Sequence, residues 1–148
     1  MYLITPEIKN FLNQQNLGYV ATVSPSGMPN ISPKGTIIGW DSETLAFVNI
    51  RSPDTIDNLK NNPSVEINVI DPILRKGYLF SGVCTILSSG NLFDEIFSYY
   101  RNIGVTSVIH SIVLVKLSQI SPVTSPLYDA GISEDEMKLK WKTHFKIL

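Results

Sequence analysis

The sequence contains few of the residues that cross-link a chain or hold a metal. Among its 148 residues there are one cysteine, Cys84, and two histidines, His110 and His144. One thiol cannot form an internal disulfide, and three residues this far apart do not have the spacing of zinc ligands. We therefore expect no metal site, and we interpret Cys84 as a small buried apolar residue of a cytoplasmic protein.

Long apolar runs and an excess of one charge are also missing. No apolar run reaches the ~18 residues of a membrane span, and the start of the chain does not have the pattern of a secretory leader. The 12 basic and 13 acidic residues give a net charge of -1, which argues against nucleic acid or a membrane surface as partner. We expect one soluble domain over residues 1–148, whose 43% hydrophobic content is compatible with a self-association surface.

The motifs of several common enzyme classes are absent as well. We find no P-loop, no dinucleotide glycine fingerprint and no serine nucleophile elbow. His110 lies in an apolar run that is typical of a strand, and we interpret it as a core or interface histidine. His144 lies between lysines on an expected helix and is interpreted as a surface residue.

Apolar periodicity and turn residues divide the chain into helices and about six strands. The expected helices cover residues 5–16, 53–61 and 91–104, and a last helix begins at Ser133 with a capping box to Glu136. The expected strands cover residues 19–23, 31–40, 44–50, 64–70, 78–87 and 107–120. Short turns between strands favour an antiparallel barrel, because closure removes exposed edges. Residues 121–148 are expected to form a C-terminal arm and helix.

The strand "PNISPKGTIIGW" carries the first candidate site. With a period of two, one face carries Asn30, Ser32, Lys34 and Thr36. This pattern has two interpretations, a half-solvated barrel strand or a polar surface that faces a ligand. Pro33 cannot donate to a ladder and Gly35 has no side chain, so pairing is expected to be irregular here. Irregular backbone leaves amides and carbonyls that a planar heterocycle can use.

The segment "NIRSPDTIDNLKNNP", residues 49–63, carries the second candidate site. If Ser52 is the N-cap and Pro53 the first helical residue, the first-turn amides and the helix dipole can bind a phosphate. Thr55 and Asn58 share a helix face and could reach the same group, and Arg51 stands just before the turn. Lys34 could add a second charge-assisted bond.

The same segment can also be a capped connecting helix without a ligand. Asp54 and Asp57 are acidic, and carboxylates at a helix start are common partners of the dipole. Asn49, at the end of the preceding strand, is either a site residue or a turn cap. The local pattern leaves these alternatives open.

Taken in order, these elements resemble the FMN-binding split-barrel family of pyridoxamine 5'-phosphate oxidase-like proteins. The resemblance covers roughly residues 3–120 and rests on "PNISPKG", on "SPDTIDNL" with its "NNP" stop, and on "SGVCTIL". It implies a mainly β (α+β) fold, a six-stranded antiparallel split barrel with peripheral helices. It also implies a homodimer with one FMN at each of two sites in the subunit interface.

The resemblance further implies where FMN would bind. The strand at Ser32, Pro33, Lys34, Gly35 and Thr36 would lie along the flavin ring, whereas the phosphate and ribityl chain would approach Asn49, Ser52, Thr55 and Asn58. Family members often carry a lysine where this chain has Asp54, so Arg51 or Lys34 would have to replace that cation. The chain ends in "KTHFKIL" and lacks the basic C-terminal signature of true pyridoxamine phosphate oxidases, so that activity is not expected.

Three functions remain open at this point. The first is an FMN-dependent oxidoreductase that passes hydride or electrons between FMN and a small substrate or a nicotinamide. The second is a non-catalytic FMN-binding electron carrier or flavin-storage protein. The third is a small barrel that binds another planar cofactor, such as a deazaflavin or haem, or none. No acid–base residue stands out, so we name binding residues and no catalytic ones.

Overall fold

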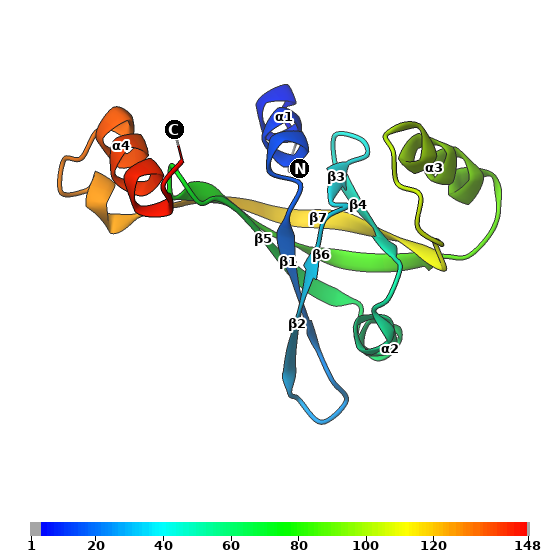
Figure 1. Cartoon of the computed structure of the whole chain (residues 1–148). Helices are drawn as coiled ribbons and strands as arrows, with labels where there is room; N and C mark the ends of the chain where they lie inside the picture. Colours follow the sequence, from blue (N-terminus) through cyan, green and yellow to red (C-terminus); the bar gives the residue numbers. More distant parts are fainter. Residues whose placement is uncertain (1–3, 148) are drawn as a thin grey trace.

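The fold is a single antiparallel sheet of seven strands that curls into a split barrel, with helices on its periphery (Figure 1). The structure is a computed structural model that describes residues 4–147. Its strands are β1 (Gly18–Val23), β2 (Pro29–Lys34), β3 (Ile38–Gly39), β4 (Thr44–Asn49), β5 (Ser64–Asp71), β6 (Lys76–Leu87) and β7 (Ser111–Thr124). Its helices are α1 (Pro6–Gln15), α2 (Pro53–Asn61), α3 (Asn91–Asn102), the short 3-10 helix η1 (Pro126–Tyr128) and α4 (Glu134–Phe145). The expected fold class, a mainly β split barrel with peripheral helices, is confirmed.

The strand count differs from the expected six because residues 31–40 do not form one strand. The order in the sheet is β2-β1-β5-β6-β7-β4-β3, so β2 and β3 are its two outer strands although they are consecutive in the chain. β2 pairs with β1, and β3 pairs with β4. Residues 35–37 therefore leave the ladder and connect the two edges of the curled sheet.

Two apolar clusters stabilise this arrangement, and β4 belongs to both. Its residues Leu45 and Phe47 lie in the barrel interior, to which α1 contributes Leu12. Its alternate residues Ala46 and Val48 lie in the second cluster, beneath α3. Successive side chains of a strand point to opposite faces, so burial on both faces gives β4 its continuous apolar sequence. The second cluster attaches α3 to the outside of the barrel.

Helix boundaries follow their local signals closely. Thr5 caps α1 by accepting a hydrogen bond from the Ile8 backbone N–H at 3.2 Å, and Pro6 is the first helical residue. The N-cap half of the expected capping box at α4 is confirmed, because Ser133 Oγ accepts from the Glu136 N–H at 3.1 Å. The Glu136 carboxylate accepts from the same hydroxyl at 3.1 Å. These contacts are made within one helical turn.

The expected strand over residues 107–120 begins later, at Ser111, and runs to Thr124. The prediction that His110 lies in an apolar strand is wrong, because His110 is exposed and precedes the first ladder residue. Its backbone N–H donates to the Asn49 carbonyl at 2.9 Å, which guides the loop into the sheet. His144 is exposed on α4, as expected, and Cys84 is buried, with its thiol pKa raised to about 12 by burial.

Residues 125–147 form what we call the C-terminal lobe, which lies at the left end of the sheet in Figure 1. The lobe contacts the β5–β6 turn through several side chains. The Tyr128 hydroxyl donates to the Leu74 carbonyl at 2.6 Å, and the Arg75 guanidinium lies 3.4 Å from the centroid of the Trp141 ring. Lys76 forms an ion pair with Glu134 at 2.8 Å. The lobe is thus anchored to one turn of the barrel strands.

Within residues 4–147, no helix has the length and apolar character that a membrane crossing requires. The same part of the chain holds no cluster of three or more His, Cys, Asp or Glu side chains arranged to bind a metal ion.

Candidate functional site

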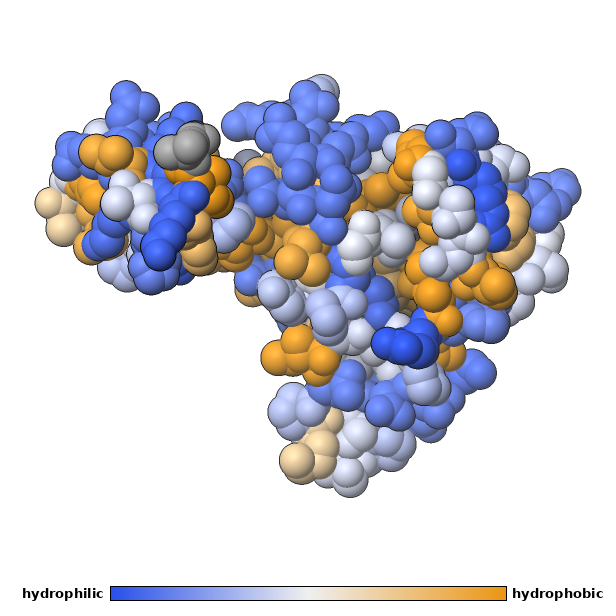
Figure 2. Space-filling model, viewed as in Figure 1, coloured by the Kyte–Doolittle hydropathy of each residue, from blue (hydrophilic) through white to orange (hydrophobic). Residues whose placement is uncertain are grey.

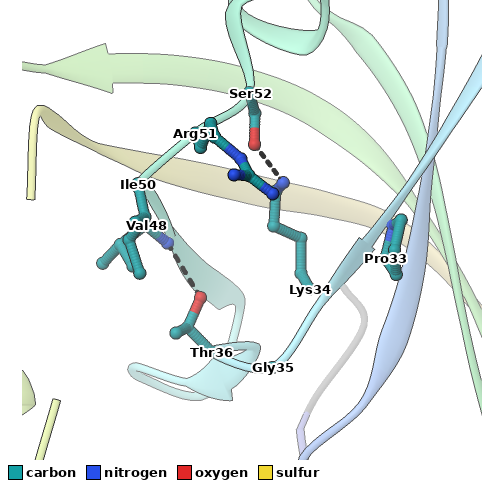
Figure 3. Close-up of a pocket in the computed structure, with 8 residues that line it drawn as sticks. All are labelled: Pro33, Lys34, Gly35, Thr36, Val48, Ile50, Arg51 and Ser52. Atoms are coloured by element: carbon teal, nitrogen blue, oxygen red, sulfur yellow. Dashed lines mark hydrogen bonds between the residues drawn. The ribbon is translucent and has the colours of Figure 1, made fainter. Parts of the chain in front are cut away.

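A cavity of about 350 Å³ lies where the two edges of the sheet are connected. It is lined by the end of β2 and the following link, by the end of β4, and by the residues before α2 (Figure 3). The lining residues are Pro33, Lys34, Gly35, Thr36, Val48, Ile50, Arg51 and Ser52. Its volume is within the range of small-molecule sites, roughly 300 to 1,000 Å³. The two sequence segments singled out as candidate sites therefore meet in space.

Lys34 is the only charged residue of this cavity that is buried, with 8% of its surface exposed. Its ammonium donates to Ser32 Oγ at 2.7 Å and to Ser52 Oγ, the contact drawn in Figure 3. The ion pairs among residues 4–147 are Lys76–Glu134 and Lys116–Glu43, so Lys34 has no carboxylate partner there. Burial lowers the pKa of the Lys34 ammonium, because an ammonium is less well solvated inside the protein.

Ser52 occupies the predicted N-cap position of α2, but its hydroxyl does not cap the helix. The hydroxyl accepts from Lys34 instead, and the Ser52 backbone N–H donates to Asn49 Oδ1 at 3.1 Å. Asn49 therefore acts as a turn cap, one of its two predicted roles. Arg51 is exposed, lines the cavity, and extends toward the Lys34 ammonium in Figure 3. Two cationic side chains thus face one cavity.

Thr36 forms the wall on the other side. Its Oγ1 accepts from the Val48 backbone N–H at 3.1 Å, and its carbonyl accepts from the Tyr100 hydroxyl at 2.8 Å. Together with the contacts of Ser32, Ser52 and Asn49, this means that four side-chain oxygens around the cavity and the Thr36 carbonyl are engaged within the protein. The charged groups that remain available to a ligand are cations.

Thr55 and Asn58 lie on the buried face of α2, with 2% and 7% of their surfaces exposed. The Asn58 amide donates to Thr22 Oγ1 of β1 at 3.1 Å. This contact attaches α2 to the sheet, and neither residue belongs to the cavity lining. Of the ten predicted cofactor residues, Pro33, Lys34, Gly35, Thr36, Arg51 and Ser52 line the cavity, and Ser32 and Asn49 support it. That any of the ten binds a cofactor stays a prediction.

The sequence interpretation missed Val48, Ile50 and Tyr100. Val48 and Ile50 are the apolar aliphatic residues of the cavity lining. They lie two residues apart at the end of β4, so the strand period of two could have placed them on one face. Tyr100 belongs to α3, and no local pattern connects it with residue 36.

The strand β2 has an inverted distribution of polar and apolar residues. Ser32 and Lys34 point inward, whereas Ile31 is 67% exposed and Pro33 is exposed too. The ladder places Ile31 opposite Ala21 and Pro33 opposite Tyr19 of β1, so these four residues share the outer face. A half-solvated strand normally has its polar side outward. Here the polar side faces the cavity, and the apolar side is uncovered in one copy of the chain.

The sequence profile of the pyridoxamine 5'-phosphate oxidase family matches residues 4–120. The chain belongs to this family. The matched segment includes the complete cavity and ends inside β7, so the C-terminal lobe of this family member lies outside it. A comparison with curated protein sequences gave no match.

Solved structures share the fold of this family member. HupZ of Group A Streptococcus is 29% identical, with a TM-score of 0.76 over 83% of this chain and 96% of that chain. An FMN-binding protein of Syntrophomonas wolfei is 18% identical, with a TM-score of 0.69 over 80% of this chain and 84% of that chain. HutZ, the heme storage protein of Vibrio cholerae, is 20% identical, with a TM-score of 0.62 over 84% of this chain and 95% of that chain. The fold is therefore shared by proteins with different cofactors.

Proposed function

We propose that this chain is an FMN-binding oxidoreductase whose cavity at Lys34 holds the phosphate end of FMN. The observation that carries the proposal is the buried Lys34 ammonium, which has no carboxylate partner among residues 4–147. A buried cation is costly unless it is paired, so a bound anion would supply the missing partner. Family membership and an FMN-binding protein of the same fold support FMN as that anion.

The other groups of the cavity suit the rest of this ligand. Arg51 can add a second charge-assisted bond to phosphate. Ile50, which is partly exposed, offers apolar surface, and the link at Gly35 and Thr36 offers backbone to a planar ring. Bound FMN supplies the redox chemistry, and the protein contributes binding, orientation and exclusion of water. The partner in the reaction is proposed to be a small substrate or a nicotinamide.

We further propose that the chain is a homodimer in which the uncovered outer face of β1 and β2 packs against a second copy. Tyr19 and Ile31 expose 47% and 67% of their surfaces there, and Val23 exposes 38%. In Figure 2 a small apolar patch lies at the upper part of this hairpin, which projects downward from the barrel. Pro33 belongs to this face and also lines the cavity, so a second copy seated here would adjoin the cofactor. Two-fold pairing of identical faces is the commonest form of assembly.

Flavin titration of the purified protein tests the proposal. We expect FMN to bind with quenching of its fluorescence, and riboflavin, which lacks the phosphate, to bind more weakly. Anaerobic bleaching of the bound flavin by NADH or NADPH distinguishes an enzyme from an electron carrier. The absence of FMN binding would overturn the cofactor assignment.

A parallel titration with haem serves as a control for cofactor identity. Haem also carries carboxylates that Lys34 and Arg51 could bind, and one protein of this fold is a heme storage protein. Among the described residues that line the cavity, none has an imidazole, thiol or thioether that could ligate iron. We therefore expect FMN to bind more tightly than haem.

A further inference from the structure

Tyr100 of α3 forms a hydrogen bond with Thr36, which lies 64 residues away in the link between β2 and β3. Its side chain is fully buried in the apolar cluster between α3 and β4, beside residues such as Ile96 and Ile112. From there its hydroxyl donates to the Thr36 carbonyl at 2.8 Å. Burial raises the pKa of this phenol well above its ordinary value, so the hydroxyl keeps its proton and remains a donor.

The acceptor of this bond is a backbone group that the sheet leaves without a ladder partner. Thr36 lies between β2 and β3, where the chain crosses from one edge of the sheet to the other. Its side-chain Oγ1 is held separately by the Val48 N–H at 3.1 Å. Thr36 is therefore fixed from two directions, by α3 through its carbonyl and by β4 through its hydroxyl.

Fixing Thr36 has a direct consequence for the cavity. Thr36 and its neighbour Gly35 form one wall, and Figure 3 shows Thr36 held to Val48 across from Lys34. Because the Thr36 carbonyl accepts from Tyr100, this acceptor is engaged with α3. A wall that is held in place before binding also loses less conformational freedom when a ligand arrives.

We propose that Tyr100 is a positioning residue for the ligand: it fixes the Gly35–Thr36 wall in its binding conformation without lining the cavity itself. The proposal rests on the proposed FMN function for its ligand. It divides the cavity into two parts, an anion end at Lys34 and Ser52 that does not depend on α3, and a ring end at Thr36 that does. It also assigns a role in the site to α3, which lies on the outside of the barrel.

Substitution Tyr100→Phe tests this division, because it removes one hydroxyl and keeps the buried ring. Tyr99→Phe is the matched control, since the neighbouring ring packs edge-on against Trp40 at 5.9 Å. We expect Tyr100→Phe to raise the dissociation constants of FMN and of riboflavin by about the same factor, up to about tenfold, since the lost hydrogen bond lies within the protein and acts on the ligand through the wall. Inorganic phosphate should compete for the anion end with an unchanged constant. Lys34→Met should give the opposite pattern, with FMN and phosphate weakened and riboflavin unaffected.

A ligand-free measurement separates this inference from the FMN assignment. The Val48 amide donates to Thr36, so its hydrogen exchange, followed by NMR, reports on the wall directly. We expect Tyr100→Phe to accelerate exchange at Val48 while ladder amides such as Val113 keep their protection. Unchanged exchange at Val48 would overturn the positioning role even if FMN binds. Uniformly faster exchange, or equal weakening of FMN and phosphate, would show a merely structural role and would also overturn it.

Discussion

The Lys34 ammonium of β2 donates to the Ser52 hydroxyl at the start of α2. This contact joins the two segments that form the cavity and directs a buried cation toward it. It also uses the hydroxyl that would otherwise cap α2, so Ser52 contributes to the site rather than to helix stability. Lys34 is therefore the buried cation of the cavity, beside the exposed Arg51.

Substitution Lys34→Met is expected to weaken FMN binding by about 10- to 100-fold. The reason is the loss of one charge-assisted hydrogen bond, worth about 1.5–3 kcal/mol. In contrast, the ligand-free protein should keep or gain stability, because an unpaired buried ammonium is replaced by an apolar side chain of similar length. Calorimetric titration and thermal unfolding measure the two effects. Lys60→Met on the exposed side of α2 is the control and should change neither.

The pH dependence of the ligand-free protein should carry the signature of Lys34. Burial lowers the pKa of Lys34 in the folded state below the ordinary value of 10.5. Between these two values the unfolded chain binds more protons, so the stability of the folded protein rises with pH in that window. FMN affinity should fall over the same window, as the ammonium loses its proton. Denaturant unfolding at a series of pH values, compared with Lys34→Met, isolates this contribution; identical pH profiles would contradict it.

Substitution Asn58→Ala should affect stability more than binding. Its amide donates to Thr22 across the α2–β1 contact, and removal leaves a buried hydroxyl without its partner. We expect a loss of about 1–3 kcal/mol in the free energy of unfolding, measured with urea, and an FMN constant close to that of the wild type. Asp57→Ala, on the exposed face of the same helix, is the control. A large loss of FMN affinity in Asn58→Ala would instead support the phosphate contact implied by the family resemblance.

Substitution Ile31→Glu should convert the proposed dimer into a monomer. A carboxylate at this position would be buried against the second copy without a partner, which is strongly unfavourable. Sedimentation or light scattering at micromolar concentration gives the mass. Leu139→Glu on the C-terminal lobe, a residue with 71% of its surface exposed, is the control and should stay dimeric. A monomeric wild-type protein would contradict the shared-interface proposal.

Substitution Trp141→Ala should loosen the C-terminal lobe and leave the cavity unchanged. The Arg75 guanidinium stacks on the Trp141 ring, and this contact between the lobe and the barrel is worth up to about 2 kcal/mol when desolvated. We expect limited proteolysis to cleave within residues 125–147 sooner, with an unaltered FMN constant. Phe145→Ala, at a ring that is 46% exposed, serves as the control. Equal protection of Trp141→Ala and wild type would show that other contacts hold the lobe.

Features that depend on neighbouring residues could be predicted from the sequence. The caps at Thr5 and Ser133 depend on contacts within one helical turn. The start of α2 at Pro53 depends on the backbone angle that the proline ring fixes. The alternation of β2 also placed Ser32 and Lys34 correctly on one face. These local patterns were sufficient to identify both segments that line the cavity, the strand ending at Lys34 and the residues before α2.

Features that depend on distant pairing could not be predicted in the same way. The break between β2 and β3 arises because these strands pair at opposite edges of the sheet, which no local pattern encodes. The partners of Asn58 and Thr36 are Thr22 and Tyr100, which lie 36 and 64 residues away. Thr22 and Tyr100 are buried residues, and no pattern in their own sequence segments indicates these contacts.

The two walls of the cavity lie close together in the chain. Thr36 accepts from the Val48 N–H across only 12 residues, and β3 pairs with β4 in a local hairpin. The Tyr100 contact with Thr36 spans 64 residues and closes a much larger loop. Because long-range contacts form more slowly than hairpins, we expect the walls to approach one another early in folding and α3 to fix them later.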